Sequence, residues 1–250
     1  MIHRLDYGVQ ISCAGRISQI ILTLYQKKDT ITMSDLQICS LAYEGKTQLF
    51  QQILNENPQL AVKKDQSGRT ALHWACSGGH HRIAEILINN YHVNIEEGDD
   101  SGWTPLIIAV SAGREEIVDL LLQCGADVNT TNSTGQCSLH YAASKNRETI
   151  VKKLIERKAD VNVRDCVNST PLHRSASKGN STITKLLIES RATLNPQDTG
   201  GNSPLHAACE EGRSNDVKLL IDAGANPYLK NKDEQTPHDI AAKSVINLLS

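Results

Sequence analysis

The sequence contains very few aromatic residues. It has a single Phe among 250 residues, and Phe, Trp and Tyr together account for 4%. Aromatic rings usually supply much of the buried area of a globular core. A chain that is 39% hydrophobic with so few rings must pack small and aliphatic side chains. This composition favours regular layers of similar residues over one irregular core.

An excess of charge is also missing. The 26 basic and 28 acidic residues leave a net charge of −2, so no global positive field exists to attract nucleic acid. No run approaches the roughly 20 apolar residues that span a bilayer. The most apolar N-terminal run, at 17–25, is short and has none of the flanks of a secretory signal. We expect no nucleic-acid or membrane partner, and a location in the cytoplasm and nucleus.

Closely paired cysteines are missing as well. The seven cysteines are scattered without a C-x-x-C pair, which suits free thiols in a reducing compartment. One stretch nevertheless resembles a ligand cluster. "RTALHWACSGGHH", which begins at Arg69, contains His73, Cys76, His80 and His81. A metal site needs three or four converging ligands with supporting hydrogen bonds, so the spacing alone decides nothing.

A short segment recurs at intervals of 33 or 34 residues. It reads TALHWAC, TPLIIAV, CSLHYAA, TPLHRSA, SPLHAAC and TPHDIAA, beginning at Thr70, Thr104, Cys137, Thr170, Ser203 and Thr236. Each unit resembles the ankyrin repeat in period and in its T-P-L-H-x-A motif. The resemblance implies an all-α fold, an ankyrin-repeat solenoid of seven stacked helix-turn-helix repeats with β-turn tips.

The same pattern predicts the domain organisation. We expect an N-terminal extension at 1–32 and a repeat domain at 33–250, with repeats at about 33–64, 65–98, 99–131, 132–164, 165–197, 198–230 and 231–250. Met33 opens the first matching segment. Residues 1–32 are therefore expected either to be absent from the natural protein or to form a disordered extension.

Local signals predict where the helices begin and end. A Thr or Ser followed by Pro suits a helix start, since the hydroxyl caps it and proline tolerates the first turn. In the second helix at 114–126, Ile117, Leu120, Leu121 and Cys124 share one predicted apolar face. Gly125 and its counterpart Gly224 suit a left-handed helix end. Long basic residues, Lys158 and Arg191, take that place in two other repeats, where we expect some strain or a different cap.

The end units are expected to be caps. Repeat stacks bury apolar surface only against their neighbours, so the outer faces of the end units must be more polar. The segment 232–250 is predicted to supply a first helix and a shortened second helix.

Within the repeat, the ligand-like cluster has a structural interpretation. His73 recurs as His140, His173 and His206, which predicts a hydrogen bond between layers at each level. Cys76 takes a slot that is small and apolar in other units. The chain has no phosphate-binding loop, dinucleotide fingerprint or nucleophile elbow. We expect no enzymatic activity, no cofactor and no metal.

A repeat stack instead offers an extended concave surface, made of turn tips and the exposed side of the first helices. The pattern places Ile108 on this side and makes the surface aromatic, then basic, then acidic along the chain. Aromatic residues and Arg are favoured anchors of protein interfaces. The predicted partner-binding residues are Arg69, Trp74, Trp103, Arg114, Tyr141, Lys145, Arg174, Lys178, Glu210 and Glu211.

Several segments narrow the resemblance within the family. "CSLAYEGK" at Cys39, "DDSGWTPL" at Asp99 and "LHYAASKNR" at Leu139 are similar to the proteasome-associated branch of the ankyrin-repeat proteins. That resemblance implies a monomeric assembly chaperone of the proteasome regulatory particle base. Its partner would be the C-terminal domain of a proteasomal ATPase subunit, with Arg69 and Lys145 facing acidic residues.

Other partners stay open at this stage. The same surface would serve a general ankyrin-repeat adaptor or a cyclin-dependent-kinase-binding regulator acting on cell-cycle proteins. The retinoblastoma-associated L-x-C-x-E motif of the branch is degenerate here, because Ala207 stands in place of Leu ahead of Cys209. We therefore discount retinoblastoma protein as a partner. Ile107 replaces the repeated His in one unit, which is expected to loosen that junction.

Overall fold

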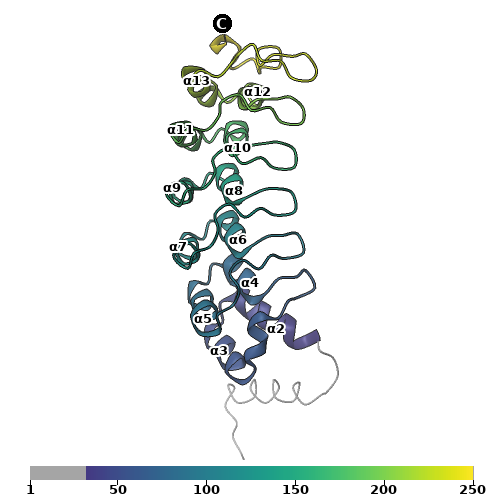
Figure 1. Cartoon of the computed structure of the whole chain (residues 1–250), viewed down its shortest axis with the longest axis vertical. Helices are drawn as coiled ribbons and strands as arrows, with labels where there is room; N and C mark the ends of the chain where they lie inside the picture. The colour runs from purple at the N-terminus through teal and green to yellow at the C-terminus, as the bar shows by residue number, and fades with distance from the viewer. Residues whose placement is uncertain (1–31, 250) are drawn as a thin grey trace, which may run out of the picture. The chain divides into compact units, whose positions relative to one another are not determined.

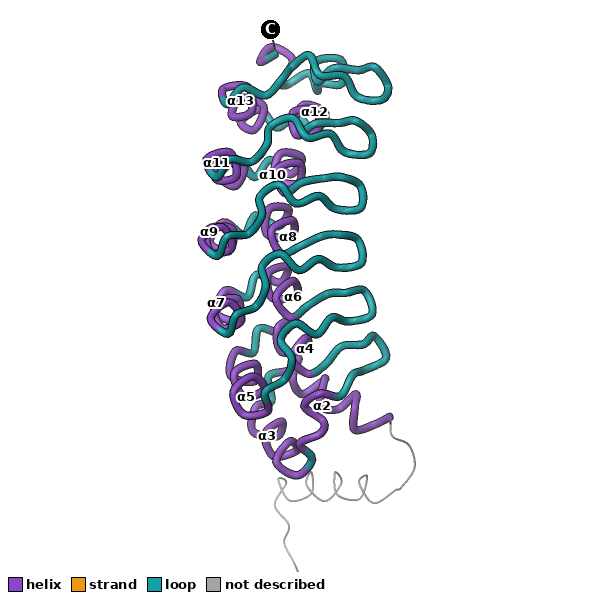
Figure 2. The backbone as a smooth tube through the Cα atoms, viewed as in Figure 1, coloured by secondary structure: helices purple, strands orange, loops and turns teal. Residues whose placement is uncertain are grey.

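The computed structural model describes residues 32–249, and we name its repeats by the ranges given above. The expectation for the N-terminal extension falls almost entirely outside these residues. A compact unit at 35–250 contains two columns of short helices (Figures 1 and 2). The first helices of successive repeats stack in one column and the second helices in the other, with loops projecting to one side. The predicted all-α repeat fold is confirmed.

The first column contains α2 (Thr32–Glu44), α4 (Ala71–Gly78), α6 (Pro105–Ala112), α8 (Ser138–Ser144), α10 (Pro171–Lys178) and α12 (Pro204–Glu210). The second contains α3 (Thr47–Glu56), α5 (His81–Tyr91), α7 (Glu115–Gln123), α9 (Glu148–Glu156), α11 (Ser181–Glu189) and α13 (Ser214–Asp222). Two 3₁₀ helices are η1 (Pro58–Val62) and η2 (Ile246–Leu248). The remainder of 32–249 is turn and loop, with one isolated β-bridge between Thr131 and Cys137.

The first helices begin and end where the sequence predicts. Thr104 is extended, and its Oγ1 accepts a hydrogen bond from the Ile107 N–H at 3.4 Å, with Pro105 in the first turn. The helix stops at Gly113, whose φ of 73° lies in the left-handed region that only glycine adopts without cost.

The second helices bury a wider face than the periodicity suggests. In α7 the buried residues are Ile117, Val118, Leu121 and Leu122, whereas Leu120 is only partly buried and Cys124 is exposed. The prediction that Cys124 belongs to the apolar face was wrong. Helix α7 packs against its own first helix α6 and against the second helices α5 and α9 on either side, so its buried stripe is set by several neighbours.

The predicted strain at two helix ends has a clear backbone signature. Lys158 and Arg191 adopt φ values of 63° and 66°, the left-handed conformation that Gly125 and Gly224 adopt in the equivalent places. A side chain with a Cβ pays about 1–2 kcal/mol in this region.

Four histidines join neighbouring repeats. His173 Nδ1 accepts the Thr170 backbone N–H at 3.1 Å, and its Nε2 lies 3.0 Å from the Asn202 carbonyl oxygen in the next repeat. Because Nδ1 is an acceptor, the proton of the neutral ring sits on Nε2, which donates to Asn202. The same inter-repeat bond is made by His73 to Trp103, His140 to Ser169 and His206 to Gln235. The predicted interlayer role is confirmed.

A second ladder of bonds caps the first helices. Arg114 donates from Nε and Nη2 to the Ser77 carbonyl at 3.2 and 3.1 Å, and Arg213 donates from Nε to the Ser177 carbonyl at 3.0 Å. These carbonyls belong to last helical turns, which have no partner inside the helix and attract cations. Asn180 and His80 make the equivalent bonds to Ala143 and Tyr43.

A third ladder joins the loops that follow the second helices. The side-chain oxygens of Asn129, Asn162 and Asn195 accept the backbone N–H groups of Asp160, Thr193 and Asn226, each at 2.8 Å. The turn tips are joined by backbone bonds too, such as Cys166 N–H to the Thr134 carbonyl at 2.9 Å. Tyr228 occupies the asparagine place in the last such loop and is 82% exposed.

The last unit differs from the prediction. Residues 237–240 form turns in place of a first α-helix, and the short η2 is the only helical part after them within the described chain. Asp239 takes the histidine place and accepts bonds from the Thr236 N–H and hydroxyl at 2.8 and 2.7 Å. Short helices are stable mainly through packing, and this unit has a neighbouring repeat on one side only.

Candidate functional site

Each projecting turn is held by one Asp or Asn side chain. In the turn at Asp165, Oδ1 accepts the backbone N–H groups of Val167 and Ser169 at 3.0 and 2.9 Å. This pair of bonds closes the turn and leaves Oδ2 for another donor. The equivalent residues are Asp65, Asp99, Asn132, Asp198 and Asn231.

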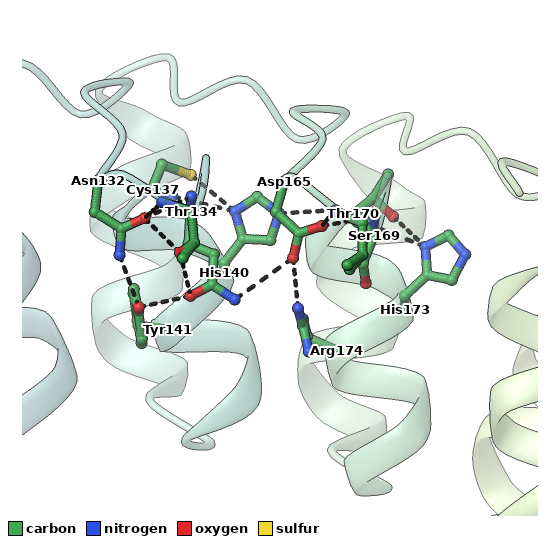
Figure 3. A network of polar contacts seen from close by, with 12 residues as sticks. Asn132, Thr134, Cys137, His140, Tyr141, Asp165, Ser169, Thr170, His173 and Arg174 are labelled. Carbon is green, nitrogen blue, oxygen red and sulfur yellow. Dashed lines mark hydrogen bonds and ion pairs between the residues drawn. The ribbon is translucent and has the colours of Figure 1, made fainter. Parts of the chain in front are cut away.

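In three of these turns, the remaining atom of the Asp or Asn side chain reaches the first helix of its own repeat. Trp74 Nε1 donates to Asp65 Oδ2 at 2.8 Å, and Asn132 Nδ2 donates to the Tyr141 hydroxyl at 2.9 Å. Arg174 pairs with Asp165 in the same way, as Figure 3 shows. Three of the predicted binding residues, Trp74, Tyr141 and Arg174, are thus tied to the turns and are half-buried.

The ionisation of the Asp165 carboxyl is set by its burial and by the hydrogen bonds and the ion pair that it makes. Burial alone would raise the pKa of Asp165, but the Arg174 guanidinium and the backbone N–H groups of Ser169 and Val167 lower it below its usual value. The negative charge is therefore matched within the chain. A binding partner would therefore contact the Asp165–Arg174 ion pair and not a free carboxylate.

The Arg69 side chain contacts both the next repeat, through Asp99, and the ring of Trp74. Its Nε donates to Asp99 Oδ2 at 2.9 Å, and its guanidinium carbon lies 5.2 Å from the centre of the Trp74 ring. Burial opposes ionisation of Asp99, yet the Trp103 N–H and Arg69 hold its pKa below the ordinary value. Within the described residues, the two terminal nitrogens of Arg69 make no hydrogen bond, so they can still meet an acidic partner.

Aromatic contacts continue along the same side. Trp103 and Tyr141, from adjacent repeats, have ring centres 4.5 Å apart, and Tyr43 meets Trp74 edge-on at 5.8 Å. Tyr43 is 51% exposed and was not predicted. Its place 34 residues before Ser77 was the available signal, but the first repeat lacks the motif that sets the register. Ile108 was predicted to be exposed, and this was wrong, because the structure buries it at 6% exposure.

The exposed charges lie at the ends of three successive first helices. Lys145 follows α8, Lys178 ends α10, and Glu210 and Glu211 close α12, and all four are exposed. Glu211 lies 3.5 Å from Arg213, whereas Lys145 and Lys178 have no ion pair among the described residues. We call these four residues the helix-end charges.

Arg114 makes bonds between repeats. It precedes α7, and its guanidinium is engaged with Ser77 in the helix-capping ladder. Arg114 thus bonds between repeats, which the motif did not predict because Arg114 lies outside it; its role in partner binding stays a prediction.

The ligand-like cluster is occupied by scaffold contacts. His73 is fully buried, and both its ring nitrogens are used, by the Thr70 N–H and by the Trp103 carbonyl. Burial raises the pKa of the Cys76 thiol well above its usual value. In the part of the chain that the structure describes, no three His, Cys, Asp or Glu side chains are arranged to hold a metal ion, and no helix is long and apolar enough to cross a membrane.

The cysteine of the degenerate L-x-C-x-E segment lies inside the stack. Cys209 is fully buried in α12, and burial raises its pKa to about 12. A partner could not reach this thiol without unfolding the repeat.

Comparison with known proteins identifies the repeats and finds relatives among proteasome regulatory subunits. The family model for ankyrin repeats (3 copies) matches residues 38–132, 92–165 and 139–231. The chain is 47% identical over 73 residues to the 26S proteasome non-ATPase regulatory subunit 10 of Homo sapiens, covering 29% of this chain and 32% of that protein. The subunit of the same name from Rattus norvegicus is also 47% identical over 73 residues, or 29% of this chain and 31% of that protein.

A third relative is matched over a longer segment. The probable 26S proteasome regulatory subunit p28 of Saccharomyces cerevisiae is 36% identical over 112 residues, covering 43% of this chain and 49% of that protein. The matches therefore span from about a third to a half of the length of these relatives.

Proposed function

Because this chain belongs to the ankyrin-repeat family, which the family model matches across residues 38–231, we propose that it is a non-catalytic protein-binding scaffold of the proteasome. In this proposal it acts as an assembly chaperone of the regulatory particle base. The partner is the C-terminal domain of one proteasomal ATPase subunit. The names of the relatives, which are proteasome regulatory subunits, support this choice.

The observation that carries the proposal is the set of helix-end charges. Among the described residues, Lys145 and Lys178 have no ion partner, and in the next repeat their slot is taken by exposed Glu211, directly after exposed Glu210. A partner with acidic residues opposite Lys145 and Lys178 and basic residues opposite Glu210 and Glu211 would bind in one orientation only. Charge patterns of this kind set register and speed association.

Arg69 completes the proposed surface at its other end. Its terminal nitrogens are available for a carboxylate, while Asp99 and Trp74 hold the side chain in place. A preorganised guanidinium loses less side-chain entropy on binding than a free one. Trp74 and Tyr43 supply partly exposed rings next to it.

The test is co-purification and calorimetry with each proteasomal ATPase C-terminal domain in turn. We expect the wild type to bind one of them, and the variant Lys145→Glu/Lys178→Glu to bind it at least tenfold more weakly, which corresponds to 1.4 kcal/mol or more. Neither lysine has a role in the stack, so the variant should unfold at the same denaturant concentration as the wild type.

Lys218→Glu is the matched control, because Lys218 is exposed on the second helix α13. Equal affinity of the double variant and the wild type would overturn the proposed surface. Capture of kinases or other proteins in place of ATPase subunits would favour the general adaptor. We also propose a cytoplasmic and nuclear location, which imaging of the tagged full chain would test.

A further inference from the structure

Three core positions around one repeat junction carry polar side chains where other repeats carry small or aliphatic ones. Asp216 of α13 aligns with Ile83, Ile117, Ile150 and Ile183, all of which are buried. Thr184 of α11 aligns with Ala84, Val118 and Val151, and Ser175 of α10 aligns with Ala75, Ala109 and Ala142. Asp216, Thr184 and Ser175 are all at most 1% exposed.

These polar side chains contact one another across the junction of repeats 165–197 and 198–230. Thr184 Oγ1 donates to Asp216 Oδ1 at 2.5 Å, and Ser181 Oγ donates to Asp216 Oδ2 at 2.6 Å. Thr184 Oγ1 lies 3.0 Å from Ser175 Oγ, and Ser175 Oγ donates to the Leu172 carbonyl oxygen at 3.2 Å. Each carboxylate oxygen of Asp216 thus receives a hydroxyl from the preceding repeat.

Ionised Asp216 is costly in this place. A buried carboxylate loses hydration that two neutral hydroxyls replace only in part. Burial raises the pKa of Asp216, although the Ser181 and Thr184 hydroxyls and the charge of Arg213 pull it back. Arg213 does not form an ion pair with Asp216 in the described chain, since its Nε is bonded to the Ser177 carbonyl.

The other charged groups around α13 are engaged elsewhere or neutral. Elements α11, α12 and η2 pack against α13. On α11, Lys185 and Glu189 are exposed and lie 3.9 Å from each other. On α12, His206 is held neutral in its ladder, Cys209 is a buried thiol and Glu210 is exposed; η2 has no charged residue. Besides burial, the groups that affect the ionisation of Asp216 are therefore mainly the Ser181 and Thr184 hydroxyls and the charge of Arg213.

We propose that Asp216, Ser181 and Thr184 form a proton-sensitive joint, which holds residues 198–249 to the preceding repeats more tightly when Asp216 is protonated and more loosely when it is ionised. The protonated acid can donate to a hydroxyl oxygen, and the hydroxyls rotate to accept. Loss of the joint opens 198–249 as one unit while the repeats before it stay folded. The inference does not depend on the proteasomal role.

The direction of the effect follows from linkage. A carboxyl that binds its proton more tightly in the closed joint than in the open one makes the closed joint more stable as pH falls. The gain is confined to the range between the ordinary value of 3.8 and the raised value in the closed joint. Above this raised value the joint is in its looser form.

Hydrogen exchange of the full chain, followed by mass spectrometry, tests the joint. Asp216→Asn places a neutral group of the same shape in the network. At pH 7.0 we expect peptides from 198–249 to exchange several-fold more slowly in Asp216→Asn than in the wild type. Between pH 7.0 and 4.5 this difference should shrink, by at most about tenfold per pH unit for one proton. Peptides from 65–164 should not distinguish the two proteins.

Comparison of two proteins at each pH cancels the intrinsic exchange rate and the titration of His206. Asp222→Asn, an exposed acid in the same helix, is the control and should behave as the wild type. If Asp216→Asn fails to fold, the variant Ser175→Ala/Thr184→Val/Asp216→Ile rebuilds the side chains found in repeat 132–164 and should show the same slower exchange. Equal exchange of 198–249 in wild type and variants at pH 7.0 would overturn the proposal, as would a difference that persists unchanged at pH 4.5.

Discussion

At the ends of two second helices, a long basic residue adopts a backbone conformation that its side chain disfavours. Lys158 and Arg191 end second helices in the left-handed region, where Gly125 and Gly224 end others. We predict that Lys158→Gly and Arg191→Gly each raise the free energy of unfolding by about 0.5–1 kcal/mol, since relief of about 1–2 kcal/mol of strain exceeds the entropy cost of glycine.

Urea denaturation would measure the change, with Lys185→Gly as the opposite control. Lys185 lies within α11, where glycine should cost about 1 kcal/mol. If Lys158→Gly destabilised the protein to the same extent as Lys185→Gly, the strain would be refuted.

Each buried histidine contributes two bonds at one point of the stack. We predict that His173→Ala lowers the free energy of unfolding by about 2–4 kcal/mol, because it leaves the Thr170 N–H and the Asn202 carbonyl without their partner and opens a cavity. Exposed His238, replaced by Ala, should change stability by less than about 0.5 kcal/mol. Similar losses for the two variants in a denaturant titration would argue against the ladder.

At the level of single residues, the motif predicted which side chains recur but not what each one contacts. His173 could be assigned to a layer because its slot repeats. Arg114 could not, because its acceptor is a carbonyl 37 residues earlier in sequence, and a carbonyl leaves no mark in a sequence pattern. Tyr141 and Arg174 were expected to face a partner, and the structure adds that each is also bonded within its own turn.

At the level of elements, helix starts and ends could be predicted because a Thr-Pro pair at the start and a left-handed glycine at the end act locally. The buried face of α7 could not be predicted in this way, and neither could the turns at 237–240 that replace the first helix of the last repeat. Both depend on which elements pack alongside. The terminal segment buries Val245 completely while Ile246 and Leu248 stay partly exposed. One neighbour is enough to hold this segment but not to make it helical.

This terminal segment should act as a cap. We predict that deletion of 232–250 lowers the free energy of unfolding by at least about 2 kcal/mol, roughly the value of one buried aliphatic side chain, and increases self-association. Denaturant titration and size-exclusion chromatography would measure the two effects. Ile246→Ser changes an exposed side chain of the same segment and should have little effect; full stability of the deleted chain would contradict the capping role.

Across the whole molecule, the histidine ladder makes stability depend on pH. Burial lowers the pKa of His73, His140, His173 and His206 below 6.5 in the folded state. As pH falls below about 6.5, the unfolded chain gains protons that the folded chain cannot bind, so stability decreases. We predict a loss of about 1–3 kcal/mol between pH 7.5 and 5.5, within the limit of 1.36 kcal/mol per proton and pH unit.

Chemical denaturation at a series of pH values would measure this loss. His173→Ile copies the residue found at 107 and should reduce the slope, because one of the four imidazoles is gone. A free energy of unfolding that stays constant or rises as pH falls would contradict the assignment of the four imidazole rings as neutral rings that donate from Nε2.

The loop asparagines give the stack a direction. Every rung runs from an oxygen in one repeat to an N–H in the next, and the series stops at Tyr228, which lies beyond the last accepted N–H. A copy of residues 132–164 inserted after 164 would offer its asparagine oxygen to the repeat that follows and its backbone N–H to the repeat that precedes. The chain can therefore be lengthened by whole units of this size, and a duplication in its gene would yield a longer binding surface without a new fold.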